Sequence, residues 1–379
     1  MRLNLLLPEI TKEIGLDNKT AVKNILLLAL CILRKGTVVL NKLKSDVGLV
    51  LENEKTSPSS NYRRLTRTVT KHSMSPVWLT LMQCVFSLLR LRTKYLILDG
   101  TNWYKGKFFH NYMVLSIVYK KVAIPIYWEP LKRKGTSSEE QRKTLLENAL
   151  KHFDLTGKVL LADREYIGRE WFKFLKSKGL HFAIRVTRNY YKNEINAAVG
   201  KSYDALCNKV LRSKCPNKAV AKAFILRGVP LRFIVSKNAT TVSKKDLLLL
   251  ITTLEEHPAT VSKQYAIRWK IEHCFKQLKT NGFNLEDMNV QGFYKHRFII
   301  AIVVFAYTLS VYFGLKEYKK VTIKKYRNGA AYKSESIFRF GQHLLLLKLP
   351  SFYHFLKLLH MLIHKNKNTY RSPHSFFVQ

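Results

Sequence analysis

The chain has 379 residues, 47% of them hydrophobic and 12% aromatic, so it can form a large core and is not a disordered tail. Its 66 Lys and Arg residues outnumber 25 Asp and Glu residues, and the formal charge of +41 indicates a polyanionic partner, nucleic acid above all. A basic solvated surface of the ribosomal kind is the alternative. The five cysteines include no close pair of the zinc-binding kind and fit a reducing compartment.

Residues 1–90 are predicted to be helical and basic. The stretch TAVKNILLLALCILRKG has a helix start signal at Thr20 and a stop signal at Gly36, and PVWLTLMQCVFSLLRLR predicts another helix with Pro76 in its first turn. Between them, SPSSNYRRLTRTVTKHSMS is polar and loop-like at its front. Small helical units with exposed Arg and Lys suit DNA binding, and an ordinary helical bundle is the alternative.

A β-rich pattern begins at Tyr95. The runs YLILD, YMVLSIVY and VAIPIYW predict three strands, and the link Lys120–Lys121 is short enough only for a hairpin. They are followed by the helix SSEEQRKTLLENALKHF, capped by Ser137 or Ser138, the strand VLLADREY, the helix GREWFKFLKSKG and the strand HFAIRVT. A three-stranded meander followed by alternating helix and strand predicts a mixed α/β sheet with flanking helices.

Residues 189–256 interrupt this alternation. Polar, irregular sequence precedes the strand-like runs AFILRG, LRFIVSK and LLLLITTL, so we predict a β-rich insertion. Further on, the apolar run Phe298–Leu315 reaches the lower length limit of a membrane-spanning helix. Because basic chain flanks it and it contains Thr308, Ser310 and Gly314, we interpret it as a buried core helix, with a membrane span as the alternative.

Two acids end predicted strands of the sheet, Asp99 the first strand and Asp163 the fourth. Ligands of open α/β sheets gather at the carboxyl ends of strands, where two carboxylates and a third from a helix can hold divalent cations. Magnesium suits such oxygen ligands, and two ions can stabilise the attacking and leaving oxygens of a phosphodiester. A lone Asp at a strand end is also a common turn or cap residue. The acids that compete as ligands are Asp154, Glu165, Glu286 and Asp287.

The third acid is predicted on the stretch YAIRWKIEHCFKQLK, which has the pattern of one continuous helix. In an ideal helix Tyr265, Arg268, Glu272 and Lys279 lie within about 60° of one another, beside an apolar stripe. Glu272 would then complete the carboxylate set, while the other three could hold DNA phosphates. The alternative is a solvated helix face on which Glu272 pairs with a basic residue one turn away.

At these residues the sequence resembles the DDE transposases of bacterial insertion sequences, in particular insertion-sequence family four. That family carries a Tyr-Arg-Glu-Lys signature, which Tyr265, Arg268, Glu272 and Lys279 match without a gap. LILDGT resembles the first acidic motif of the family and LLADREY the second, so the resemblance implies that Asp99, Asp163 and Glu272 are the catalytic acids. GFNLEDMN resembles the stretch that often follows the signature.

The resemblance extends from about Tyr95 to Leu315 and implies a ribonuclease-H-like core. It also implies cut-and-paste transposition, in which the three acids hold two Mg²⁺ ions, with Mn²⁺ able to substitute, and the Tyr, Arg and Lys of the signature contact DNA. The implied partners are the terminal inverted repeats, target DNA and a second copy of the chain in a homodimeric synaptic complex. The implied location is the bacterial cytoplasm, on the nucleoid and not in a membrane. Some members place a Trp in the insertion to stack on a flipped base, whereas the five Trp residues here lie outside it.

The sequence thus predicts a chain in five parts: residues 1–90 as a helical DNA-binding region, 91–188 as the first part of the catalytic core, 189–256 as the insertion, 257–315 as the second part of the core, and 316–379 as a basic helical region. An active transposase is the leading hypothesis. The alternatives are an inactive, transposase-derived DNA-binding protein, a metal-dependent nuclease without strand transfer, and a membrane protein with a basic face.

Overall fold

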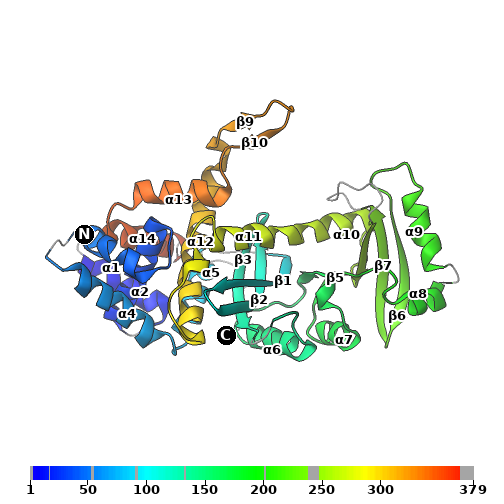
Figure 1. Ribbon diagram of the computed structural model, residues 1–379, viewed down its shortest axis with the longest axis horizontal. Helices are drawn as coiled ribbons and strands as arrows, with labels where there is room; N and C mark the ends of the chain where they lie inside the picture. The colour runs from blue at the N-terminus through cyan, green and yellow to red at the C-terminus, as the bar shows by residue number, and fades with distance from the viewer. Residues whose placement is uncertain are drawn as a thin grey trace. The chain divides into compact units, whose positions relative to one another are not determined.

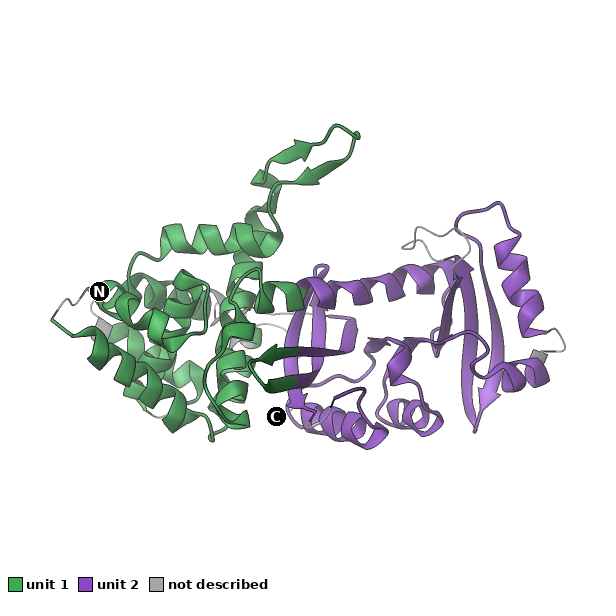
Figure 2. Cartoon of the chain, in the orientation of Figure 1, with its two compact units in different colours: residues 1–91, 103–110, 274–374 green, residues 92–102, 111–273, 375–379 purple. Residues whose placement is uncertain are grey.

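The computed structural model describes residues 3–16, 18–52, 55–89, 93–131, 134–199, 202–237 and 247–367. The chain divides into two compact units (Figure 2). Unit 1 comprises residues 1–91, 103–110 and 274–374, and unit 2 is formed mainly by residues 92–102 and 111–273. The five-part division defines its parts by function and stays a prediction.

Unit 2 is built on a mixed sheet of eight strands in the order β3-β2-β1-β4-β5-β8-β7-β6 (Figure 1). The strands are β1 (Tyr95–Lys105), β2 (Phe108–Tyr119), β3 (Val122–Pro130), β4 (Val159–Ala162), β5 (His181–Arg185), β6 (Ala219–Leu226), β7 (Val229–Lys237) and β8 (Leu247–Thr252). The tips of β1 and β2 belong to unit 1.

The first five strands have the ribonuclease-H-like arrangement that the sequence predicted. β2 pairs antiparallel with β3, and β4 pairs parallel with both β1 and β5. β4 is buried at all four positions, as expected for a strand covered on both faces. The first strand does not end at Asp99, however. Its pairing with β4 stops at Leu98, but β1 continues to Lys105 and turns into β2 at Gly106.

The helices of unit 2 are α6 (Glu139–Leu150), α7 (Arg169–Ser177), α8 (Lys192–Val199), α9 (Tyr203–Leu211), α10 (Pro258–Tyr265) and α11 (Lys270–Lys279), with the 3₁₀ turns η1 (Arg164–Tyr166) and η2 (Ala266–Trp269). Residues of α11 from Cys274 on belong to unit 1. Of the two predicted caps of α6, Ser138 is the one used, in a capping box with Gln141. α6 packs on β3, α7 on β5 and β7, and α10 on β5, β6 and β7.

The insertion is partly helical, although its first half was predicted to be irregular. α8 and α9 form there because Ser202 caps α9 and because Ile195, Leu206 and Val210 are buried. The three predicted strands are confirmed as β6, β7 and β8. They extend the core sheet, since β8 pairs antiparallel with β5.

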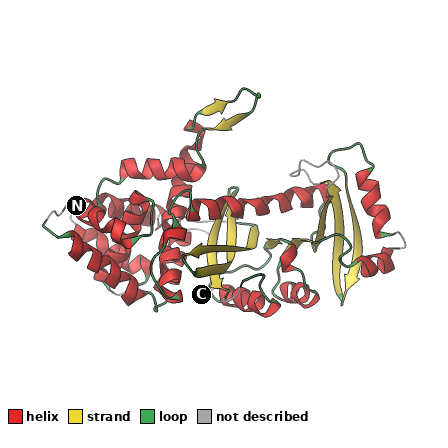
Figure 3. Ribbon diagram, in the orientation of Figure 1, coloured by secondary structure: helices red, strands yellow, loops and turns green. Residues whose placement is uncertain are grey.

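Unit 1 is mostly helical (Figure 3). Its helices are α1 (Leu3–Ile14), α2 (Lys19–Lys35), α3 (Leu40–Leu51), α4 (Pro58–His72), α5 (Val77–Leu89), α12 (Phe293–Glu317), α13 (Ile337–Lys348) and α14 (Phe352–Lys367). It also contains the 3₁₀ turns η3 (Leu285–Asp287) and η4 (Tyr318–Lys320) and a hairpin of β9 (Ile323–Lys325) and β10 (Ala331–Lys333).

The helix α12 is a core helix, as predicted, and the most apolar window of this helix is 83% buried inside the protein. It packs against α2, α5 and α13. The crossing with α13 is so close that a Cβ atom at Gly314 would lie 2.0 Å from the carbonyl oxygen of Ile337, and one at Gly341 would lie 1.8 Å from that of Ser310. Glycine at these two positions therefore allows the backbones of the two helices to touch.

Helix boundaries in unit 1 follow local signals. Gly36 ends α2 in the left-handed conformation, as predicted, and Asn18 is the N-cap of that helix. The stretch that was predicted to be loop-like is the start of α4, because Ser57 caps it and Pro58 occupies its first turn. At the other end of the chain, the segment around Pro350 separates α13 from α14.

Candidate active site

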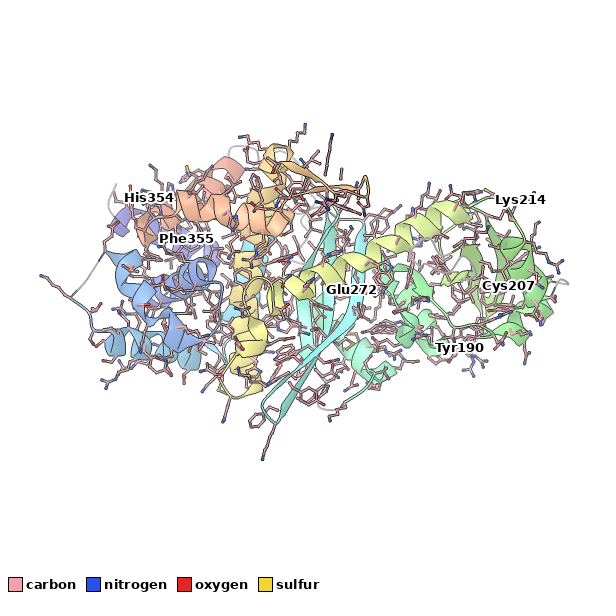
Figure 4. All side chains as sticks on the ribbon, turned by 45° about the horizontal axis from the view of Figure 1, so that its top comes forward. Tyr190, Cys207, Lys214, Glu272, His354 and Phe355 are labelled. Carbon is pink, nitrogen blue, oxygen red and sulfur yellow. The ribbon has the colours of Figure 1, made fainter. Side chains whose placement is uncertain are left out.

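The stretch from Tyr265 to Lys279, which carries the signature, is not one continuous α-helix, so that prediction was wrong. α10 ends at Tyr265, a 3₁₀ turn follows over Ala266–Trp269, and α11 begins at Lys270. A 3₁₀ turn has three residues per turn, which places the side chains of Tyr265 and Arg268 on the same side of the segment. Figure 4 shows Glu272 on the α11 part of the segment.

One buried guanidinium joins the three predicted acids. Arg268 Nη1 lies 3.0 Å from Asp99 Oδ2, and Arg268 Nη2 lies 3.8 Å from Asp163 Oδ2 and 3.3 Å from Glu272 Oε1. The side chain of Arg268 is 4% exposed, whereas that of Glu272 is 48% exposed. Acids from three separate elements therefore converge on one point, and the cluster opens to solvent at Glu272. The alternative was wrong in placing Arg268 on a solvated face, although Glu272 does pair with this basic residue one turn away, as that alternative predicted.

Asp99 and Asp163 reach this cluster from neighbouring parallel strands. β1 and β4 pair up to Leu98 and Ala162, so the next residue of each strand lies at the same edge of the sheet. Each carboxylate accepts a hydrogen bond from the backbone N–H of the residue after it, at 2.9 Å for Asp99 and 2.8 Å for Asp163. These bonds use Oδ1 and hold each side chain so that Oδ2 lies toward Arg268.

The cluster contains more negative than positive charge. Burial raises the pKa of Asp99 to about 6, the Arg268 guanidinium limits that rise, and the charges of Glu165 and Asp163 add to it. Glu165 Oε1 would lie 3.7 Å from a Cβ atom at Gly100, so it is a fourth carboxylate beside Asp99. Four carboxylates against one guanidinium leave a net charge of −3 when all are ionised.

The donor set fits a divalent metal ion. Carboxylate oxygens are the hard ligands that Mg²⁺ prefers, and those of Asp99, Asp163 and Glu272 already surround a cationic group, the guanidinium. A divalent cation would offset the excess negative charge and favour the ionised form of Asp99, whose pKa burial has raised.

Of the four acids that competed as ligands, Glu165 is the one that the structure places beside Asp99. Asp154 lies in the loop before β4, where it accepts a hydrogen bond of 3.1 Å from the Thr156 backbone, so it belongs to the opposite end of that strand. Glu286 and Asp287 belong to unit 1, where each is ion-paired with a lysine, at 3.0 and 3.3 Å.

A basic pocket of about 130 Å³ opens beside Tyr265 and Arg268. Its other cations come from β5, from the residue before β6, from the end of β7 and from α10: Arg185, Lys218, Lys237 and Lys263. Among the described residues no carboxylate lines it. Burial raises the pKa of Tyr265, so its phenol is neutral in the wall of this cationic pocket. These four cations were not predicted from the sequence, because they come from separate elements and form no local motif.

Lys279 lies at the end of α11, in unit 1. Its Nζ forms an ion pair of 3.0 Å with Glu286 and lies 5.8 Å from the centroid of the Trp103 ring. The structure thus brings Arg268 together with the three acids and Tyr265, while Lys279 has contacts of its own in the other unit.

The strand order and the acids at the edge of the sheet place the chain among ribonuclease-H-like proteins. Residues 91–309 match the family model for the transposase DDE domain, which is more than half of the chain, and the chain belongs to this family. Transposase DDE domains generally use divalent metal ions, in keeping with the donor set described above.

No curated protein sequence gives a significant match. Among solved structures, the cryo-EM structure of a piggyBac transposase synaptic complex with hairpin DNA is similar, with 12% sequence identity and a TM-score of 0.49. The similarity covers 94% of this chain and 77% of that one.

Proposed function

We propose that the protein is an active transposase of insertion-sequence family four, in its Tyr-Arg-Glu-Lys signature group, and that it catalyses cut-and-paste transposition. The observation that carries the proposal is the contact of Arg268 with Asp99, Asp163 and Glu272. These residues match three separate motifs of the group, and the fold collects them in one cluster. Membership of the transposase DDE family supports the reaction class, phosphodiester hydrolysis at transposon ends followed by strand transfer.

The three acids would hold two Mg²⁺ ions, for which Mn²⁺ can substitute. Bound there, the metal would act as a Lewis acid on the oxygens of the scissile phosphodiester. Asp99 is available as a ligand at neutral pH, because its pKa of about 6 leaves it mostly ionised. The backbone hydrogen bonds to Asp99 and Asp163 fix the direction of both carboxylates before a substrate arrives.

Arg268 can serve both the acids and the DNA. Without metal it neutralises part of the carboxylate charge, and its planar fork is equally suited to two oxygens of a phosphate. The basic pocket next to it supports this second role, since Lys218 and Lys263 extend the positive lining away from the acids. Tyr265, which lines the same pocket, would help to position the terminal nucleotide, and Lys279 would bind a further phosphate.

Affinity for DNA would come from the basic surface outside the acids. In unit 1 the helix α4 exposes Arg63, Arg67 and Lys71, which makes it the best-placed element of the N-terminal region for a duplex. The partners would be the terminal inverted repeats, target DNA and a second copy of the chain in a homodimeric synaptic complex. The protein would work on the nucleoid in a bacterial cytoplasm.

Cleavage and joining assays on transposon-end DNA test this function. We expect Asp163→Asn to stop cleavage with end binding largely retained, because the phosphate contacts of the basic surface supply most of the affinity. Asp154→Asn is the matched control, since it removes an acid at the other end of β4, and it should cleave normally.

Each other outcome has a distinct meaning. A wild-type protein that binds ends without cutting them is an inactive descendant of a transposase, and one that cuts without joining is a nuclease. Normal turnover by Asp163→Asn in Mg²⁺ would remove this acid from the site and make Glu165 the next candidate.

A further inference from the structure

A second group of metal-ligating side chains lies in unit 1. It consists of Glu9 on α1 and of His360 and His364 on α14. The Nε2 atoms of the two histidines each lie 2.9 Å from Glu9 Oε2, and they lie 2.9 Å from each other. The histidines are four residues apart and so occupy the same face of α14, a spacing that recurs in helical zinc sites.

Hydrogen bonds alone do not account for this triangle of atoms. A ring nitrogen of histidine either carries a proton or has a lone pair, so it cannot donate and accept at once. If both Nε2 atoms donate to Glu9, two N–H groups face each other at 2.9 Å. If one histidine donates to the other, the accepting nitrogen turns a lone pair toward the carboxylate oxygen. One contact of the three is therefore repulsive whenever Glu9 is ionised.

We propose that Glu9, His360 and His364 bind a divalent transition-metal ion, Zn²⁺ in the first place. A cation above the triangle is attracted to all three atoms at once. Two imidazole nitrogens and one carboxylate oxygen form a ligand set that zinc uses in proteins, whereas Mg²⁺ prefers oxygen alone. Glu9 and His364 are about half exposed, so solvent completes the coordination. This site is separate in residues and in chemistry from the carboxylates of the proposed active site.

The metal ion would fasten α1 to α14. The two helices pack against each other, and the liganding residues are 351 and 355 positions apart in sequence. An ion held from both sides stabilises the folded form because the unfolded chain cannot present the three ligands together. We therefore assign the site a structural role in unit 1.

Zinc binding by the full-length chain tests the proposal. The parent protein carries Asp99→Asn, Asp163→Asn, Glu165→Gln and Glu272→Gln, so that none of the four carboxylates in the unit 2 cluster remains to bind metal. After chelation and dialysis it is titrated with ZnCl₂ by calorimetry, the bound zinc is counted by mass spectrometry, and CoCl₂ is used to report tetrahedral coordination by its visible absorption.

We expect one zinc ion per chain in the parent, and a loss of affinity of at least about 100-fold when His360→Ala and His364→Ala are added. Zinc should also raise the melting temperature of the parent and not that of this variant. The matched control is His343→Ala, which removes an exposed histidine from a single His–Glu pair of 2.9 Å and should leave zinc binding unchanged. Glu9→Gln gives a second variant if the histidine pair is needed for folding.

Two results overturn the proposal. The first is a parent protein that binds no zinc or shows no tetrahedral cobalt spectrum. The second is equal zinc stoichiometry and affinity in the parent and in a folded variant that lacks either the two histidines or Glu9.

Discussion

Replacing Asp99 with Asn should stabilise the metal-free protein while it abolishes cleavage. The carboxylate of Asp99 is buried in a cluster with excess negative charge, and burial raises its pKa from 3.8 to about 6. Folding thus makes ionisation of this group harder. Asn has nearly the same shape and carries no charge, but its single side-chain oxygen can accept a hydrogen bond from Arg268 or from the Gly100 N–H, not from both.

The expected magnitude follows from proton linkage. The folded state retains a proton that the unfolded chain releases between pH 3.8 and about 6, so the free energy of unfolding falls as the pH rises through this window. The ionised form of Asp99 then costs about 3 kcal/mol at pH 8 and about half of that at pH 5. Asp99→Asn should recover this cost minus the loss of one hydrogen bond, about 1 kcal/mol, so that a net gain remains at pH 8 and little gain remains at pH 5.

Urea denaturation of wild type and Asp99→Asn in a chelator at both pH values measures the difference. Addition of Mg²⁺ should stabilise the wild type and leave the variant unchanged, because the variant lacks a ligand. Asp154→Asn is the control and should show neither effect, since Asp154 is not part of the cluster. An Asp99→Asn variant that is less stable than wild type at pH 8 without metal would refute the reasoning, because Asp99 would then stabilise the fold through its charge.

Three further predictions follow from the same site and from the helix caps. Arg268→Gln should slow single-turnover cleavage of pre-bound end DNA at least about tenfold. Arg268→Lys should restore the rate only in part, because one ammonium group cannot replace a guanidinium that contacts three carboxylates. Wild-type rates in the Lys variant would contradict this. The double variant Lys218→Gln, Lys263→Gln should bind end DNA more weakly, and titration at several salt concentrations should show a shallower dependence of the log binding constant on log salt concentration. The slope should change by about 0.9 for each phosphate that the variant no longer neutralises. An unchanged slope would exclude phosphate binding at the basic pocket. Ser138→Ala should cost about 1 kcal/mol of unfolding free energy in urea, because it removes the capping box of α6, whereas Ser138→Thr should cost little.

The core sheet and the acids were predictable because they depend on short-range signals. Alternating apolar runs and helix caps define the order of elements, and the acids follow directly after the residues that pair β1 with β4. Parallel pairing of β1 with β4 then brings Asp99 and Asp163 to the same end of the two strands, independently of contacts elsewhere in the chain. Local signals also predicted two other features correctly: a helix stop at Gly36, where α2 ends, and an apolar run that forms the buried helix α12.

The features that were not predicted depend on contacts between distant segments. The segment Ala266–Trp269 contains no helix-breaking residue, so its 3₁₀ turn cannot be read from propensity, and the turn coincides with the ion pairs of Arg268. α8 and α9 are only 8 and 9 residues long, too short for a clear helical period in a polar stretch. The pocket cations come from several elements, which no local pattern reveals. The His360 and His364 pair has a visible i, i+4 spacing on α14, but its contact with Glu9 of α1 depends on the fold.

Arg268 provides the positive charge that partly compensates the carboxylate cluster. Without a cation the acids at the edge of the sheet would repel one another, and a single buried guanidinium reduces that repulsion at the cost of its own desolvation. The compensation is incomplete, as the raised pKa of Asp99 shows. A divalent metal ion would complete it and would weaken the hold of the acids on Arg268, which could then turn to a phosphate at the adjoining basic pocket. Because binding energies are reciprocal, DNA that draws Arg268 away from the acids would in turn favour the metal. If the proposed function holds, Arg268, which offsets charge in the metal-free cluster, would therefore also link metal binding to DNA binding.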